Sequence, residues 1–126
     1  MIGVLSTDAL MFLQSSIRTV WTLEVLLLLR RDTGREWSAE DLIRESRSST
    51  VIVQEALTNL RQSGLTADEP GGHFRYQPAS PAFDQWVGEI ASAYAAQPAA
   101  IVKILRSVSS DKIQNFADAF RFRRDD

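Results

Sequence analysis

The chain has 126 residues, of which 44% are hydrophobic and 24% charged, and its formal net charge is −2. This length suits a single domain with its own core, and the composition is ordinary for a globular protein. There is no cysteine and only one histidine, His73. Disulfides, thiolate metal sites and cysteine nucleophiles are therefore excluded, and a histidine-based zinc site or catalytic triad would depend on a single residue.

The first residues lack a basic start and a small-residue cleavage site, so we expect no signal peptide. The strongest apolar run, from Val20 to Leu29, is interrupted by Thr22 and Glu24, and it is about half the length needed to cross a bilayer. We therefore expect a cytoplasmic protein that does not enter the membrane.

Two helices are predicted in the first third of the chain. Ser6 begins a run of capping residues before a short helix, and Ser15 and Ser16 either lie inside that helix or restart it. Residues 17–29 are apolar nearly all round, and their length favours a central buried helix over a strand. Arg30 and Arg31 follow, where positive charge complements the helix dipole.

The stretch from Trp37 to Gln77 reads as helix, short turn, second helix and Gly-rich hairpin. Ser38 is a good N-cap for a helix that starts at about Ala39 and ends near Arg47. Ser48 or Ser49 then caps the second helix.

The second helix has the clearest pattern in the chain. One face carries apolar residues at helical spacing: Val53, Ala56, Leu57 and Leu60. Gly64 supplies a left-handed position that ends the helix. Pro70, Gly71 and Gly72 predict a turn, after which Phe74 and Tyr76 alternate with polar residues as in a half-buried strand.

This arrangement resembles the winged helix-turn-helix family of bacterial transcription regulators, in particular those built like MarR. The resemblance covers roughly a third of the chain and rests on these residues: Leu42, Val53 to Leu57, Leu60, Gly64-Leu65 and Gly71-Gly72. It implies a mainly α fold with a small β-hairpin, in which a winged helix-turn-helix core is flanked by N- and C-terminal helices. It also implies a symmetric homodimer formed by the terminal helices, which suits the reading of two half-sites.

The expected division is an N-terminal helical extension at 1–15, a winged core at 16–78 and C-terminal helices at 79–126. Pro81 suits the first position of a helix whose inner face carries Phe83, Trp86, Val87, Ile90, Ala91 and Tyr94. Gln97-Pro98 interrupts the chain. Two further apolar stripes follow: Ile101, Ile104, Leu105 and Val108, then Ile113, Phe116, Ala117 and Phe120.

If the second helix enters the major groove of double-stranded DNA, its outward face would contact the bases. Arg47, Ser49 and Thr50 would hold phosphates, Gln54 and Thr58 would touch bases, and Arg75 would reach the backbone from the wing. The full set of candidate DNA-binding residues is Arg47, Ser49, Thr50, Val51, Gln54, Thr58, Arg61, His73 and Arg75.

The charge of this region opens an alternative. Between Ser38 and Gln77 there are six acidic residues against four arginines, whereas DNA affinity comes mainly from basic side chains. The winged helix could instead be a protein-interaction module whose mildly apolar, acidic outer face meets another protein. DNA binding is favoured from how often this fold binds DNA, which is an analogy at the level of the fold.

Other functions find less support in the sequence. No nucleophile elbow or metal-ligand spacing is present, so we expect neither an enzyme nor a cofactor. The three tryptophans could line an effector pocket, but core packing is the better interpretation. A histidine beside a turn, as at His73, is more often solvated than a pH sensor. The Arg-rich C-terminus could bind phosphates, but Asp125 and Asp126 offset its charge and favour a frayed end.

Overall fold

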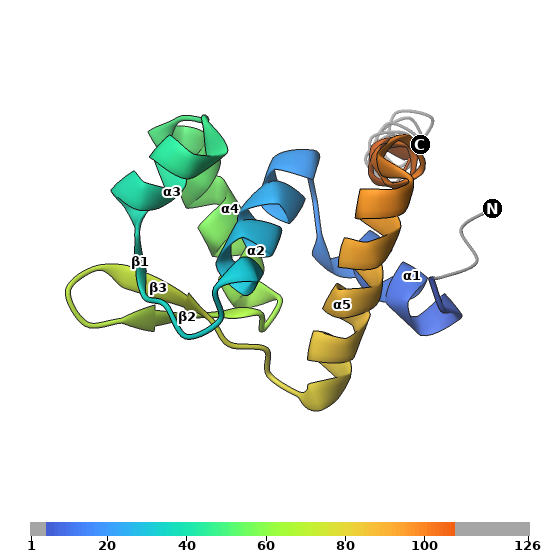
Figure 1. Cartoon of the computed structure of the whole chain (residues 1–126), viewed down its shortest axis with the longest axis horizontal. Helices are drawn as coiled ribbons and strands as arrows, with labels where there is room; N and C mark the ends of the chain where they lie inside the picture. Colours follow the sequence, from blue (N-terminus) through green and yellow to red (C-terminus); the bar gives the residue numbers. More distant parts are fainter. Residues whose placement is uncertain (1–4, 108–126) are drawn as a thin grey trace, which may run out of the picture.

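A computed structural model of the chain describes residues 5–107. Figure 1 shows its helices: α1 (Thr7–Ser16), α2 (Val20–Arg31), α3 (Ala39–Ser46), α4 (Thr50–Gln62) and α5 (Pro81–Ala96). A further helical segment covers 98–107. The strands are β1 (Trp37–Ser38), β2 (Thr66–Glu69) and β3 (His73–Tyr76). The predicted stripe at Ile113 to Phe120 and the Arg-rich C-terminus lie outside the described residues.

Hydroxyl side chains begin the helices where the sequence predicts them. Ser6, Ser38, Ser49 and Ser80 each accept a hydrogen bond from the backbone N–H three residues ahead, which satisfies a donor that the first turn leaves unpaired. Of the two predicted caps for α4, Ser49 is therefore the one used. Pro81 occupies the start of α5 as predicted, and α5 ends at the predicted break, with Gln97 as its C-cap.

The start of α2 differs from the prediction. The apolar run begins at Ile17, but the helix begins at Val20, because the Thr19 hydroxyl accepts from the Thr22 N–H at 3.1 Å and caps it there. Ile17 has an extended backbone and is still only 1% exposed. An apolar residue in a connecting segment can thus belong to the core, which helical periodicity alone does not reveal.

The three strands form one antiparallel sheet in the order β1-β3-β2. The predicted hairpin is present as β2 and β3, with Asp68 opposite Phe74, and Gly71 and Gly72 have positive φ angles in its turn. The short strand β1, which pairs Trp37 with Phe74, is not predicted by the sequence. The chain is therefore mainly helical with a small three-stranded sheet.

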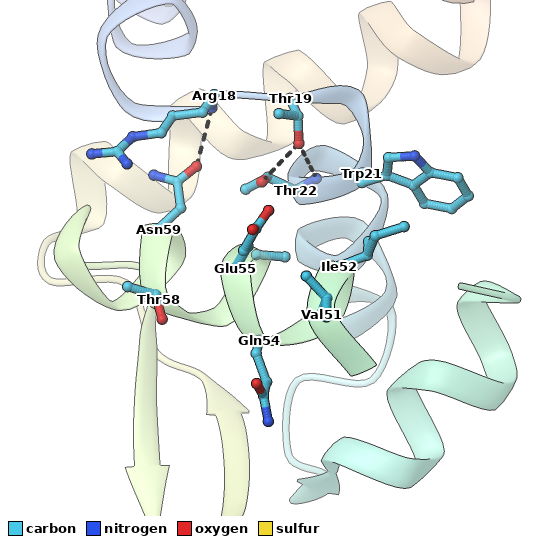
Figure 2. A pocket seen from close by; sticks show the side chains of 11 residues that line it. Arg18, Thr19, Trp21, Thr22, Val51, Ile52, Gln54, Glu55, Thr58 and Asn59 are labelled. Carbon is cyan, nitrogen blue, oxygen red and sulfur yellow. Dashed lines mark hydrogen bonds between the residues drawn. The ribbon is translucent and has the colours of Figure 1, made fainter. Parts of the chain in front are cut away.

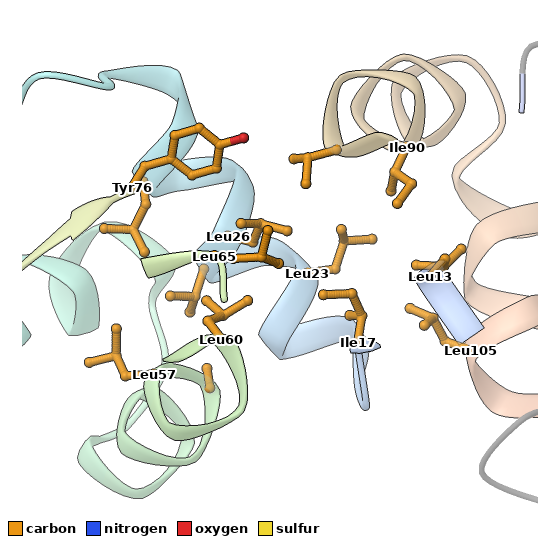
Figure 3. Packing of buried hydrophobic residues seen from close by; sticks show 14 of the residues in the cluster. Leu13, Ile17, Leu23, Leu26, Leu57, Leu60, Leu65, Tyr76, Ile90 and Leu105 are labelled. Atoms are coloured by element: carbon orange, nitrogen blue, oxygen red, sulfur yellow. The ribbon is translucent and has the colours of Figure 1, made fainter. Parts of the chain in front are cut away.

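A single hydrophobic cluster extends from α1 to Leu105. In Figure 1, α3, α4 and the sheet lie on one side of α2, and α1 and α5 lie on the other. Figure 3 shows leucines of α2 and α4 meeting in the centre of this cluster. On the α1 side, Phe12 packs against Phe83 and Trp86, with ring centroids 4.9 and 5.4 Å apart. The buried face of α5 consists of Val87, Ile90 and Ala93.

Within the described residues, no single helix is both long and apolar enough to span a bilayer. Taken together, α1 and α2 meet the criteria of length and composition, but they are bent by 114° relative to each other.

Candidate functional site

Helices α3 and α4 are joined by a tight connection of three residues. Arg47 adopts a left-handed backbone conformation, with φ of 55°, and it is the only non-glycine residue within 5–107 with a positive φ. The Ser48 N–H donates to the Ile43 carbonyl at 3.2 Å, and the Ser46 and Ser48 hydroxyls are hydrogen-bonded at 2.7 Å. This turn fixes the angle at which α4 leaves α3.

Helix α4 presents one face to the core and the opposite face to solvent. Val53, Ala56 and Leu60 are at most 1% exposed, as their spacing predicts. On the other face Gln54, Glu55 and Thr58 are exposed, and Val51 is 62% exposed. The side of α4 that could meet a macromolecule is therefore uncovered within the described part of the chain.

A groove of about 570 Å³ lies between this face of α4 and the start of α2. In Figure 2, Trp21, Val51 and Ile52 lie at one end of the groove, and Arg18 and Asn59 lie at the other. Glu55 lies between the two ends. Trp21 is 43% exposed, which contradicts its interpretation as a core residue. Trp37, at 1% exposure, matches that interpretation.

A buried amide fixes one wall of the groove. Asn59, on α4, is 5% exposed. Its Oδ1 accepts from the Arg18 backbone N–H at 3.1 Å, and its Nδ2 donates to the Ser16 carbonyl at 2.7 Å. The Ser63 hydroxyl donates to the same carbonyl at 2.9 Å. The connection between α1 and α2 is thus held against α4 by buried polar contacts.

The predicted site residues fall into two groups. The first group surrounds the start and outer face of α4 and is exposed: Arg47, Ser49, Thr50, Val51, Gln54 and Thr58. Within it, the Ser49 hydroxyl already accepts from the Ile52 N–H at 3.3 Å. A phosphate would therefore have to share this oxygen, because a cap and a ligand contact use the same group.

The second group belongs to the hairpin side, and its members already have partners. Arg61 pairs with Asp68 at 3.0 Å, and Arg75 pairs with Glu69 at 2.7 Å. The half-buried His73 ring contacts the Pro70 carbonyl through Nδ1 at 3.2 Å. Acidic side chains of the hairpin thus offset both arginines that the sequence assigned to this side.

The start of α3 carries a further set of charges. Desolvation acts to raise the pKa of Asp41, but hydrogen bonds from Ser38, the positive charge of Arg44 and a hydrogen bond from Arg35 outweigh it, so that this pKa is lowered. Arg44 contacts the carboxylate at 2.6 Å. The Arg35 guanidinium also lies 3.7 Å from the centroid of the Trp37 ring. Asp41 therefore has a structural role at the start of α3, and Arg35 and Arg44 are both engaged in contacts within the fold.

Within residues 5–107 no group of three or more acidic or histidine side chains could hold a metal ion. The outer face of α4 and the groove beside it carry amide, hydroxyl, apolar and arginine side chains together with the Glu55 carboxylate. Such groups can bind another molecule by hydrogen bonds, charge and apolar contact.

Sequence patterns do not indicate that Arg18 and Asn59 belong to this groove, and they favour core packing over a pocket for Trp21. Arg18 and Trp21 both lie within residues 17–29, whose apolar pattern predicts a helix that is buried nearly all round. Because α2 begins only at Val20, Trp21 instead lies on an exposed side of the helix. Asn59 carries one local signal, because it is a polar residue at the edge of the apolar stripe of α4.

Comparison of the chain with protein-family models, with curated proteins and with solved structures found no match.

Proposed function

We propose that the chain is a winged helix-turn-helix protein that binds double-stranded DNA and regulates transcription as a homodimer. In this proposal α4 is the recognition helix, β2 and β3 are the wing, and α1, α5 and the residues after them form the dimer contact. The observation that carries the proposal is the exposed face of α4, which begins directly after a three-residue turn and is followed by a hairpin.

The order of the elements supports the proposal. Two helices joined by a turn of three or four residues make up the helix-turn-helix unit. Here α3 and α4 are joined through Arg47, Ser48 and Ser49, and β2 and β3 follow as an antiparallel hairpin. The N-terminal residues of a recognition helix are those that contact base edges. On α4 these are Thr50, Val51 and Gln54, all of which are exposed.

The side chains of α4 fit a limited set of base contacts. A glutamine such as Gln54 can pair with adenine, and Val51 or Thr58 can contact a thymine methyl group. Arg47 has no ion-pair partner within the described residues. It lies two residues before Ser49, the N-cap of α4, and this end of a recognition helix lies close to DNA phosphates when the helix enters the major groove. Because Arg61 and Arg75 are paired with acids, we expect weak non-specific binding and a larger contribution from base contacts.

The test is binding of the full-length protein to short fluorescent duplexes, followed by anisotropy as the salt concentration rises. We expect the affinity to fall as salt is added. The logarithm of the affinity should decrease linearly with the logarithm of the salt concentration, with a slope set by the number of phosphates contacted. Selection from a random duplex pool should then recover a site with two related halves. A protein that binds no duplex at low salt would contradict the proposal.

A second candidate function is a winged-helix module that binds another protein. It is favoured by one observation, namely that Trp21 and Val51, two of the three large hydrophobic residues exposed within 5–107, border the same groove. Exposed tryptophan is typical of the centres of protein interfaces.

The variant Trp21→Ala separates the two candidates. Partner binding through the groove would require Trp21, whereas contacts of Arg47 and Gln54 with DNA would not. Loss of duplex binding in Arg47→Ala together with its retention in Trp21→Ala would favour DNA as the partner of this face.

A further inference from the structure

Arg18 is an arginine of the α4 region that the sequence did not assign to the interface. It lies in the connection between α1 and α2, its side chain is exposed, and it lines the groove beside α4. Within residues 5–107 no acidic group lies within 4.0 Å of its guanidinium. Arg61 and Arg75, by contrast, each pair with a hairpin acid. The positive charge of Arg18 is therefore available to a ligand.

The backbone of Arg18 is held in place although its side chain is exposed. Its N–H donates to Asn59 Oδ1 at 3.1 Å, and the Asn59 Nδ2 donates to the Ser16 carbonyl at 2.7 Å. Asn59 is 5% exposed, and a buried amide that lost these partners would incur a desolvation cost. The position of Arg18 relative to α4 is thus fixed by a side chain of α4 itself.

Arg18 and Arg47 lie toward opposite ends of the exposed face of α4. Arg47 precedes the helix, and Arg18 lies beside Asn59, which is nine residues after Thr50. Nine residues of α-helix span about 14 Å. Two arginines that have no ion-pair partner among residues 5–107 therefore lie toward the two ends of the exposed face of α4.

We propose that Arg18 is a phosphate-contacting residue of the DNA interface and that Asn59 is its positioning residue. This inference rests on the proposed function, since it adds a backbone contact to the same face of α4. Glu55 restricts the direction of approach, because its carboxylate lies between Arg18 and Trp21 (Figure 2). The phosphate is therefore bound on the side of Arg18 that faces away from Trp21.

The experiment measures how the affinity of the full-length protein for a random-sequence duplex depends on salt. Loss of one phosphate contact makes the slope of log affinity against log salt about 0.9 less steep. Arg18→Ala should show this change and bind a few-fold more weakly at low salt, whereas Arg18→Lys should restore the slope. Arg31→Ala, at the far end of α2, is the matched control with the same loss of charge, and it should leave the slope unchanged.

Asn59 is tested by the same slope, which loss of stability alone does not alter. Asn59→Ala should reproduce the change seen in Arg18→Ala, and the double variant should show no further change, because both substitutions remove one contact. Ser63→Ala is the matched control, since it removes a hydrogen bond to the Ser16 carbonyl and leaves the Arg18 N–H paired. If Asn59→Ala does not fold, Asn59→Gln replaces it, because glutamine moves the amide by one methylene. We expect the same change of slope for this variant.

The outcomes separate this inference from the proposed function. An unchanged slope in Arg18→Ala, in a protein that binds duplex normally, overturns the contact and leaves DNA binding intact. Additive changes in the double variant, or a wild-type slope in folded Asn59 variants, overturn the positioning role. Failure of the wild-type protein to bind any duplex overturns the proposed function, and the inference with it.

Discussion

Arg47 holds the turn between α3 and α4 in a conformation that glycine would adopt more easily. Its φ of 55° lies in the left-handed region, which costs a residue with a Cβ about 1–2 kcal/mol. Strained backbone positions of this kind concentrate at functional sites. An arginine at this strained position fits a role for its side chain outside the folding of the turn.

The substitution Arg47→Gly separates the effect of the strained backbone on stability from the effect of the arginine side chain on DNA binding. We expect the free energy of unfolding to rise by about 0.5–1 kcal/mol, because the left-handed strain outweighs the greater chain entropy of glycine. Duplex binding should weaken by the loss of one phosphate contact. Denaturant unfolding and anisotropy measure the two effects. A variant that is more stable and binds DNA as well as the wild type would contradict the role of Arg47 in the interface.

Other single residues show where the sequence suffices and where it does not. The caps at Ser38 and Ser49 and the inner face of α4 were predictable, because they depend on neighbours within one or two turns. Asn59 and Trp21 were not, because their roles depend on distant segments. Asn59 Oδ1 meets the Arg18 N–H across a separation of 41 residues, and Trp21 lines the groove together with Val51 of α4. The outward face of α4 could thus be predicted, whereas the groove beside it could not.

At the scale of elements, α5 is attached to the rest of the fold by two tyrosine–carboxylate hydrogen bonds. Tyr76 of β3 donates to Asp84 of α5 at 2.6 Å, and Tyr94 of α5 donates to Glu24 of α2. Burial, followed by the hydrogen bond to Asp84, raises the pKa of Tyr76 above its usual value. The hydrogen bond to Glu24, followed by burial, raises the pKa of Tyr94 to about 12.

These raised pKa values predict a loss of stability at high pH. A phenol whose folded pKa exceeds its unfolded value of 10.0 contributes stability that is fully present below pH 10. For Tyr94 this contribution is lost as the pH rises to about 12. Since the chain has two tyrosines, the folded protein at pH 11 should show little phenolate absorbance, and the denaturant-unfolded chain should show most of it.

The control for this prediction is Tyr94→Phe. It should remove the part of the pH dependence that belongs to the contact between α2 and α5 and leave the part due to Tyr76. Normal ionisation of both tyrosines near pH 10 in the folded wild type would show that the two hydrogen bonds do not protect the phenols.

One part of the sheet could be predicted from the sequence, and another part could not. The hairpin was predictable, because Pro70, Gly71 and Gly72 specify its turn. Strand β1 has only two residues, and it exists because Trp37 lies opposite Phe74, a pairing between distant segments. Periodicity cannot identify a strand of this length.

At the scale of the whole molecule, the terminal helices share the core of the central unit. Phe12, Phe83 and Trp86 form an aromatic cluster between α1 and α5, and Ile101 and Leu105 join the same core. These contacts bury the inner face of α1 in the core. Its outer face carries Met11, which is 61% exposed.

We propose that this outer face of α1 belongs to the homodimer contact. Met11→Lys should shift the full-length protein toward monomer in multi-angle light scattering, because it introduces a charge into an apolar contact. Gln54→Lys, at an exposed position of α4 that the proposed dimer contact does not include, is the matched control and should retain the dimer. A wild-type protein that is purely monomeric at tens of micromolar would contradict the dimer itself.

The order β1-β3-β2 leaves β2 with an outer edge that no strand within residues 5–107 covers. Such edges can template intermolecular aggregation, and short length, charged side chains and proline protect against it. Here β2 has four residues, includes Asp68 and Glu69, and is followed by Pro70. The acids that pair with Arg61 and Arg75 therefore also place charge at this edge, which disfavours pairing with a strand of another chain.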